Sequence, residues 1–134
     1  MIRFITCDDN KEALDKTVNA IRKIMMPYDF DYKISKFNKY DEELHKLIMS
    51  KDEQKVYILD VEMPNVSGLE IATEIRNNGD WESMIIFVSA HPERRDDIIF
   101  YRIIALDFIS KFYEYEKRLE ESLIKVLEIY DKKM

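Results

Sequence analysis

Five polar residues have the types and the spacing expected of a phosphoryl-transfer site. Each follows an apolar run of strand length: Asp8 and Asp9 follow the first, Asp60 the second, Ser89 the third and Lys111 the fourth. The carboxyl ends of parallel strands meet at one edge of a sheet, so these side chains are expected to lie together. Three carboxylates, a hydroxyl and an ammonium at one edge indicate metal-assisted phosphoryl chemistry.

The elements that position these residues follow from the hydrophobic pattern. Four apolar runs and one segment of alternating apolar and charged residues predict five strands. The strands are expected at residues 2–7, 30–34, 56–59, 84–88 and 105–109, and helices near 14–25, 44–48, 69–75, 93–101 and from about 115. Ser67 is the expected N-cap of the third helix. Strict alternation of strands and helices predicts an α/β fold with a doubly wound parallel sheet.

Length and composition limit the classes of function. A chain of 134 residues is about one domain, so residues 1–134 are interpreted as a single domain. The net charge of −6 argues against a general attraction of this segment to nucleic acid or to an anionic membrane. Cys7 is the only cysteine, which excludes an intramolecular disulfide. No apolar stretch approaches the roughly 20 residues that span a bilayer, and we expect a cytoplasmic protein.

These residues resemble the receiver domain of bacterial two-component response regulators, over the whole chain. The matching features are the acidic pair after the first strand, the segment Asp-Val-Glu-Met-Pro-Asn-Val-Ser-Gly from Asp60 to Gly68, Ser89-Ala90, and Lys111. The resemblance implies a flavodoxin-like (βα)5 sheet with strand order 2-1-3-4-5. The sequences around Ser89 and Lys111 are most similar to receivers attached to LytTR-type DNA-binding domains.

The resemblance also implies a role for each site residue. Asp60 would accept a phosphoryl group from the phosphohistidine of a sensor histidine kinase. Mg²⁺ would be held directly by Asp9 and Asp60, largely through water by Asp8, and by the backbone carbonyl of Glu62. Lys111 and Ser89 would contact phosphoryl oxygens. The backbone N–H groups of Val61 and Ala90 are expected to contact the remaining ones.

The implied output is a conformational switch rather than a released product. In the family, the hydroxyl at the position of Ser89 moves toward the phosphoryl group, and an aromatic ring three residues before the lysine rotates. That ring is Phe108 here, which lacks the hydroxyl of a tyrosine. The surface of the fourth helix, fifth strand and fifth helix would then bind a second copy in a homodimer, or an output domain.

Two features depart from the family pattern or vary within it. Phe112 stands where a proline in a cis peptide bond usually follows the lysine, so the geometry at Lys111 is expected to differ. Glu62 and His91 each lie two residues after a site residue, at positions that vary in the family. We hypothesise that these two side chains control how readily water attacks the acyl phosphate; two exposed loop residues without such a role are the alternative.

Simpler interpretations and other functions stay open at this point. Taken singly, Asp8 and Asp9 could cap a helix, Phe108 could be a core residue, and Gly68 could serve only a tight turn. A haloacid-dehalogenase-type phosphatase would need Asp-x-Asp after the first strand, and a nucleotide or flavin binder would need a glycine-rich loop. A third alternative is a stand-alone or phosphorylation-independent receiver that acts as a protein-interaction module. We favour a receiver that belongs to a longer transcription regulator, because residues 130–134 resemble the start of a linker.

Overall fold

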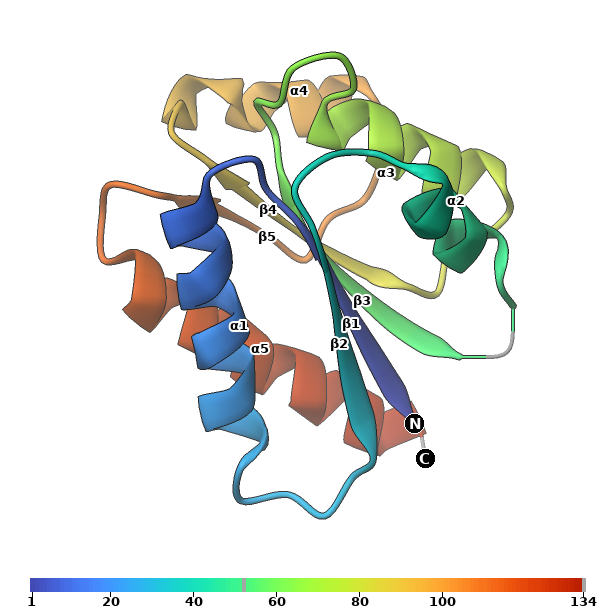
Figure 1. Ribbon diagram of the computed structural model, residues 1–134, viewed down its shortest axis with the longest axis vertical. Helices are drawn as coiled ribbons and strands as arrows, with labels where there is room; N and C mark the ends of the chain where they lie inside the picture. Colours follow the sequence, from blue (N-terminus) through green and yellow to red (C-terminus); the bar gives the residue numbers. More distant parts are fainter. Residues whose placement is uncertain (52, 134) are drawn as a thin grey trace.

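A five-stranded parallel sheet forms the centre of the computed structural model, which describes residues 1–51 and 53–133 (Figure 1). The strand order is β2-β1-β3-β4-β5, as predicted. The strands are β1 (Ile2–Cys7), β2 (Tyr32–Phe37), β3 (Gln54–Asp60), β4 (Met84–Ser89) and β5 (Asp107–Ser110). The helices are α1 (Lys11–Met25), α2 (Glu42–Met49), α3 (Gly68–Asn77), the 3₁₀ turn η1 (Pro92–Arg94), α4 (Arg95–Phe100) and α5 (Tyr115–Lys133).

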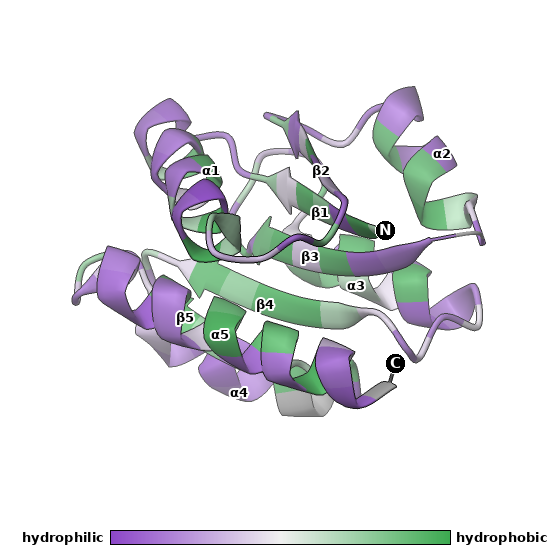
Figure 2. Ribbon diagram, turned by 90° about the horizontal axis from the view of Figure 1, so that it is seen from below, coloured by the Kyte–Doolittle hydropathy of each residue, from purple (hydrophilic) through white to green (hydrophobic). Residues whose placement is uncertain are grey.

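The helices cover both faces of the sheet, so the core has two halves. Helices α1 and α5 lie on one face, and α2, α3 and α4 lie on the other (Figure 1). Side chains of the central strand β3 alternate between these halves: Val56 and Ile58 pack toward α1 and α5, whereas Tyr57 and Leu59 pack toward α2 and α3. Strand β4 is hydrophobic along most of its length and β3 through its middle, while the helices carry many polar residues on their outer sides (Figure 2). This explains why the middle runs of the sequence are apolar throughout.

The predicted elements are present, but several of their bounds differ. β2 spans Tyr32–Phe37 rather than residues 30–34. The fourth helical segment is divided into the short turn η1 and the short helix α4. β5 begins at Asp107 rather than at residue 105, because Arg102 and Ile104 adopt positive φ angles of 57° and 59° and the backbone turns before it enters the sheet. α5 continues to Lys133, so the interpretation of residues 130–133 as a linker is wrong; Met134 lies outside the described residues.

A buried arginine holds the loop between α4 and β5. The guanidinium of Arg76 on α3 donates hydrogen bonds to the carbonyls of Ile103 and Ile104, each at 2.6 Å. It also donates to the carbonyls of Asp80 and Ser83, each at 2.9 Å. A side chain that is almost fully buried therefore uses its fixed fork of donors to tie α3 to two loops. Nothing in the sequence pattern singled out this residue.

One further sequence expectation concerns membranes. Among the residues that the structure describes, no helix combines the length and the apolar character that crossing a bilayer requires.

Candidate functional site

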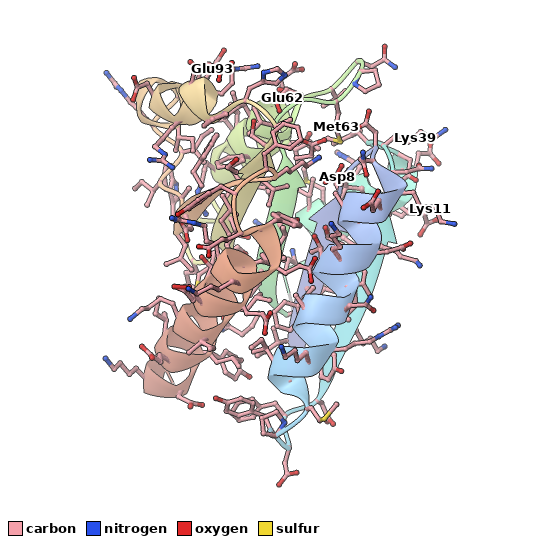
Figure 3. The ribbon with its side chains drawn as sticks, turned by 90° about the vertical axis from the view of Figure 1, so that its left-hand side faces the viewer. Asp8, Lys11, Lys39, Glu62, Met63 and Glu93 are labelled. Atoms are coloured by element: carbon pink, nitrogen blue, oxygen red, sulfur yellow. The ribbon has the colours of Figure 1, made fainter. Side chains whose placement is uncertain are left out.

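The carboxyl ends of two neighbouring strands, β1 and β3, bring the acidic residues together. Asp60 is the last residue of β3, and Asp8 and Asp9 directly follow β1, whose final residue Cys7 pairs with Leu59. One carboxylate oxygen from each of the three aspartates lies within 4.8 Å of the other two. Asp8 and Asp60 are buried, and Asp9 is exposed. Asp8 lies at the end of the molecule where the loop carrying Glu62 and Met63 also lies (Figure 3). The predicted acidic cluster therefore exists.

Lys111 completes this cluster from the end of β5. Its Nζ lies 2.9 Å from Oδ1 of Asp8 and 3.3 Å from Oδ2 of Asp60. The described residues contain no cis peptide bond, and the ring of Phe112 is exposed to solvent. The ammonium thus reaches both carboxylates although phenylalanine replaces the usual proline. Burial works against the ammonium, but the hydrogen bond and charge of Asp8, together with Asp60, raise the pKa of Lys111.

The carboxylate of Asp60 is costly to ionise in this arrangement. Burial and the neighbouring charge of Asp8 raise the pKa of Asp60 from 3.8 to about 8, and Lys111 offsets only part of this effect. If all three carboxylates are ionised, the ammonium of Lys111 supplies one positive charge against three negative ones among the described residues of this cluster. Oδ2 of Asp8 is also buried and has no hydrogen-bond partner among the described residues. An orphaned carboxylate oxygen beside excess negative charge fits a divalent cation with hard oxygen ligands.

The raised pKa of Asp60 predicts an unusual pH profile. The folded domain binds this proton more tightly than the unfolded chain between about pH 4 and about pH 8, so without metal its free energy of unfolding should fall as the pH rises through that range. Mg²⁺ should remove most of the loss, because it favours the ionised site. Urea unfolding between pH 5 and pH 8, with EDTA or with Mg²⁺, tests this expectation. A metal-free profile without a downward slope would contradict it.

The hydroxyl of Ser89 contacts the side chain of Glu62, and its contact with a phosphoryl oxygen stays a prediction. This hydroxyl is buried and donates to both carboxylate oxygens of Glu62, at 2.7 and 2.8 Å. The backbone N–H of His91 donates to the hydroxyl oxygen of Ser89 at 2.8 Å. The resemblance directs this hydroxyl to a phosphoryl group, whereas here the side chain of Glu62 accepts it. The sequence pattern suggests a metal-binding backbone carbonyl and a role in hydrolysis for Glu62, but it contains no signal for this side-chain contact.

Two successive backbone N–H groups after β3 have different partners. The N–H of Val61 donates to the carbonyl of Val88 at 2.9 Å and so belongs to the sheet, because β3 keeps its pairing with β4 through the residue after Asp60. The N–H of Glu62 donates to Oδ1 of Asp60 at 3.2 Å. Ala90 lines the cavity at the site. The contacts of the Val61 and Ala90 N–H groups with phosphoryl oxygens stay predictions.

An open cavity of about 420 Å³ gives access to Asp60. Its lining includes Asp9, Asp60, Glu62 and Lys111, together with the exposed ring of Phe112. The arrangement presents a buried carboxylate oxygen, an ammonium and a backbone N–H to a small anion that enters from solvent. Such a set can hold a phosphoryl group while an Asp60 oxygen attacks it.

Phe108, the predicted switch residue, lies on the opposite side of β5 from the acidic cluster. Its ring is buried with the core residues packed between the sheet and the α2–α3 helices. The guanidinium of Arg95 on α4 lies 5.5 Å from the ring centre. The structure thus contains one position of this ring, and its rotation stays a prediction.

Comparison with known proteins identifies the family. Residues 4–123 match the family described as "Response regulator receiver domain". The chain belongs to this family. A solved receiver domain from Methanospirillum hungatei JF-1, described as CheY-like, has a TM-score of 0.76 and 18% sequence identity, and covers 100% of this chain and 99% of that one. The receiver fold is therefore confirmed, and the family decides against the phosphatase and the flavin-binding alternatives.

Two relatives of this receiver domain bear on its output and its chemistry. Accessory gene regulator protein A of Staphylococcus aureus is 24% identical over 111 residues, which are 82% of this chain and 46% of that protein. The chain thus spans about half the length of this curated relative. A response regulator from Burkholderia pseudomallei, described with a phosphorylated aspartic acid and a calcium ion, has a TM-score of 0.59 and 16% identity, and covers 99% of this chain and 73% of that one.

Proposed function

We propose that this receiver domain accepts a phosphoryl group on Asp60 from a sensor histidine kinase. The observation that carries the proposal is the ammonium of Lys111 between the buried carboxylates of Asp8 and Asp60. A buried carboxylate without catalytic purpose would be better replaced by an apolar side chain. The phosphorylated aspartic acid in the description of the Burkholderia pseudomallei relative supports the same role.

The proposed step is a direct displacement at phosphorus. An oxygen of Asp60 forms the new P–O bond while the P–N bond to the donor imidazole breaks, and the nitrogen keeps that electron pair and takes a proton. Lys111 binds a phosphoryl oxygen as a point charge and thereby stabilises the negative charge that these oxygens carry in the transition state. The N–H of Glu62, already directed at Asp60, is placed to donate to another phosphoryl oxygen.

Mg²⁺ is the cofactor that these residues fit. Asp9 and Asp60 would hold it directly, Asp8 largely through water, and the backbone carbonyl of Glu62 would add a further oxygen. When bound, the metal neutralises the excess carboxylate charge and binds phosphoryl oxygens. Oδ2 of Asp8, which is buried and has no hydrogen-bond partner in the described part of the chain, supports this assignment.

The proposed output is a change of the surface formed by α4, β5 and α5. Movement of Ser89 and rotation of Phe108 would convey the phosphorylation to this surface, which would bind a second copy or an output domain. Because the Staphylococcus aureus relative is about twice as long as the matched region, we propose a cytoplasmic transcription regulator with an additional domain. The resemblance favours an output domain of the LytTR type.

Incubation with Mg²⁺ and a small phosphodonor such as acetyl phosphate tests the proposed function. The intact mass should increase by one phosphoryl group, the product should be labile to hydroxylamine as acyl phosphates are, and EDTA should prevent the reaction. A protein that gains no mass under any of these conditions would act as a phosphorylation-independent interaction module, and the proposed function would be wrong.

The decay of the phosphorylated protein tests the hypothesis on Glu62 and His91. If these side chains control the attack of water on the acyl phosphate, Glu62→Ala and His91→Ala should each change the rate constant of dephosphorylation by roughly threefold or more, because positioned polar groups alter proton-transfer steps. Decay is followed by intact mass after removal of the donor. Rates equal to that of the unmodified protein in both variants would refute the hypothesis.

A further inference from the structure

The hydroxyl of Ser89 has a single proton, and Glu62 accepts it in this structure. The hydrogen bond reaches both carboxylate oxygens, at 2.7 and 2.8 Å. The backbone of His91 also contacts this hydroxyl. Its N–H donates to Oγ of Ser89 at 2.8 Å, and its carbonyl oxygen is a more distant acceptor, at 3.1 Å. A hydroxyl offers one donor and two acceptor lone pairs. Of the acceptors within reach of the Ser89 proton, the carboxylate oxygens of Glu62 are closer than the carbonyl of His91 and carry the charge, so Glu62 is the favoured acceptor.

The acceptor is a charged one, and this makes the contact strong. Hydrogen bonds to an ionised carboxylate are shorter and stronger than bonds between neutral groups. Ser89 is fully buried and the Glu62 side chain is only 26% exposed, so water competes weakly for the hydroxyl. Arg94 in η1 lies 3.8 Å from the same carboxylate and bonds more closely to Asp97, at 2.6 Å. We regard the Arg94 contact as secondary, because partly exposed ion pairs contribute little.

We propose that Glu62 is a resting-state latch, whose carboxylate competes with the phosphoryl group on Asp60 for the proton of Ser89. The proposal rests on the proposed function and deepens it. Phosphorylation then requires an exchange of acceptors, in which the hydroxyl leaves one anion and turns to another. The latch favours the resting state by the free energy of the contact that must be broken.

A phosphoryl mimic that cannot be hydrolysed separates this latch from any effect on dephosphorylation. Beryllium trifluoride with Mg²⁺ serves as the probe, and its apparent affinity is measured by fluorescence or NMR titration. Glu62→Met keeps the length of the side chain but removes the acceptor. Because hydrogen bonds to charged groups are worth more than neutral ones, we expect Glu62→Met to bind the probe roughly tenfold more tightly.

A double-mutant cycle with Ser89→Ala distinguishes the latch from simple charge removal. In the Ser89→Ala background no hydroxyl remains to be released, so Glu62→Met should produce a much smaller gain. Removal of a negative charge near an anion would instead give the same gain in both backgrounds, and that result would overturn the latch. Glu93→Gln is the matched control: it removes a charge two residues after His91 that contacts the imidazole of His91 at 3.2 Å, and it should leave the affinity unchanged.

The metal-free protein offers a second readout that needs no phosphoryl chemistry. The amide resonance of His91 reports on Ser89, because this N–H donates to the hydroxyl oxygen. Glu62→Met should shift this resonance more than Glu93→Gln does, and equal shifts would overturn the resting contact. A wild-type protein that fails to bind the probe would refute the proposed function. A wild-type protein that binds it, with no dependence of the Glu62→Met gain on Ser89, would refute only the latch.

Discussion

Asp60→Asn should abolish phosphorylation and, at the same time, stabilise the metal-free fold at alkaline pH. An amide oxygen is a poor nucleophile, so the variant should gain no mass with a phosphodonor. It also removes a carboxylate that burial and Asp8 make costly to ionise, while Lys111 keeps its partner Asp8 at 2.9 Å. We expect the free energy of unfolding at pH 8 in EDTA to rise by roughly 1–3 kcal/mol. Mass spectrometry and urea unfolding measure the two effects.

The control for this prediction is an exposed aspartate on α1. Asp15→Asn makes the same chemical change away from the acidic cluster. The variant should gain the same mass with a phosphodonor as the wild type, and its free energy of unfolding should differ by no more than a few tenths of a kcal/mol at each pH. A phosphorylated Asp60→Asn variant would show that another residue is the acceptor. If Asp60→Asn is less stable than the wild type at pH 8, the contact between Asp60 and Lys111 stabilises the fold by more than the buried charge of Asp60 destabilises it.

Gly68→Ala should damage both the fold and the site. A Cβ atom at this position would lie 2.2 Å from the carbonyl oxygen of Asp60 and 2.9 Å from its carbonyl carbon. These are backbone atoms at the end of β3, so relief of the clash requires that α3 or the strand move. Overpacking of this kind costs about 2–3 kcal/mol, and the displaced Asp60 should also accept phosphate more slowly. Urea unfolding and the initial rate of mass gain are the measurements.

Gly79 provides the comparison for this variant. Its φ is +84° and nothing lies within 4 Å of the added Cβ, so Gly79→Ala introduces backbone strain without a clash. It should lower the free energy of unfolding by about 1 kcal/mol and leave the phosphorylation rate unchanged. Two results would contradict this explanation of the glycine at position 68: Gly68→Ala is no more destabilising than Gly79→Ala, or it is phosphorylated at the wild-type rate. Either would show that the close approach to Asp60 does not require glycine there.

The sequence predicts the fold and the acidic cluster because both depend on periodicity and topology. Apolar runs with polar ends locate the strands, and a parallel sheet then brings Asp8, Asp60 and Lys111 to one edge whatever the details of packing. Gly68 shows the limit of such reasoning. Its sequence position suggested a turn, whereas the structure shows that its backbone passes too close to Asp60 for any side chain.

The features that the sequence could not predict depend on side-chain directions and single backbone bonds. The hydrogen bond from Ser89 to Glu62 depends on the rotamers of two side chains on different loops. The N–H of Glu62, rather than that of Val61, donates to Asp60, because the pairing of β3 with β4 extends through Val61. The late start of β5 follows from positive φ angles at Arg102 and Ile104, residues with no intrinsic preference for them.

Helix α3 touches the site at one end and the loop before β5 at the other. Gly68 lies against the carbonyl of Asp60, and Arg76, eight residues later along the same helix, holds the carbonyls of Ile103 and Ile104. The helix spans only about 12 Å between them. One short helix therefore contacts both the carbonyl of the phosphate-accepting residue proposed here and the backbone that precedes β5, where Ile104 has a left-handed φ of 59°.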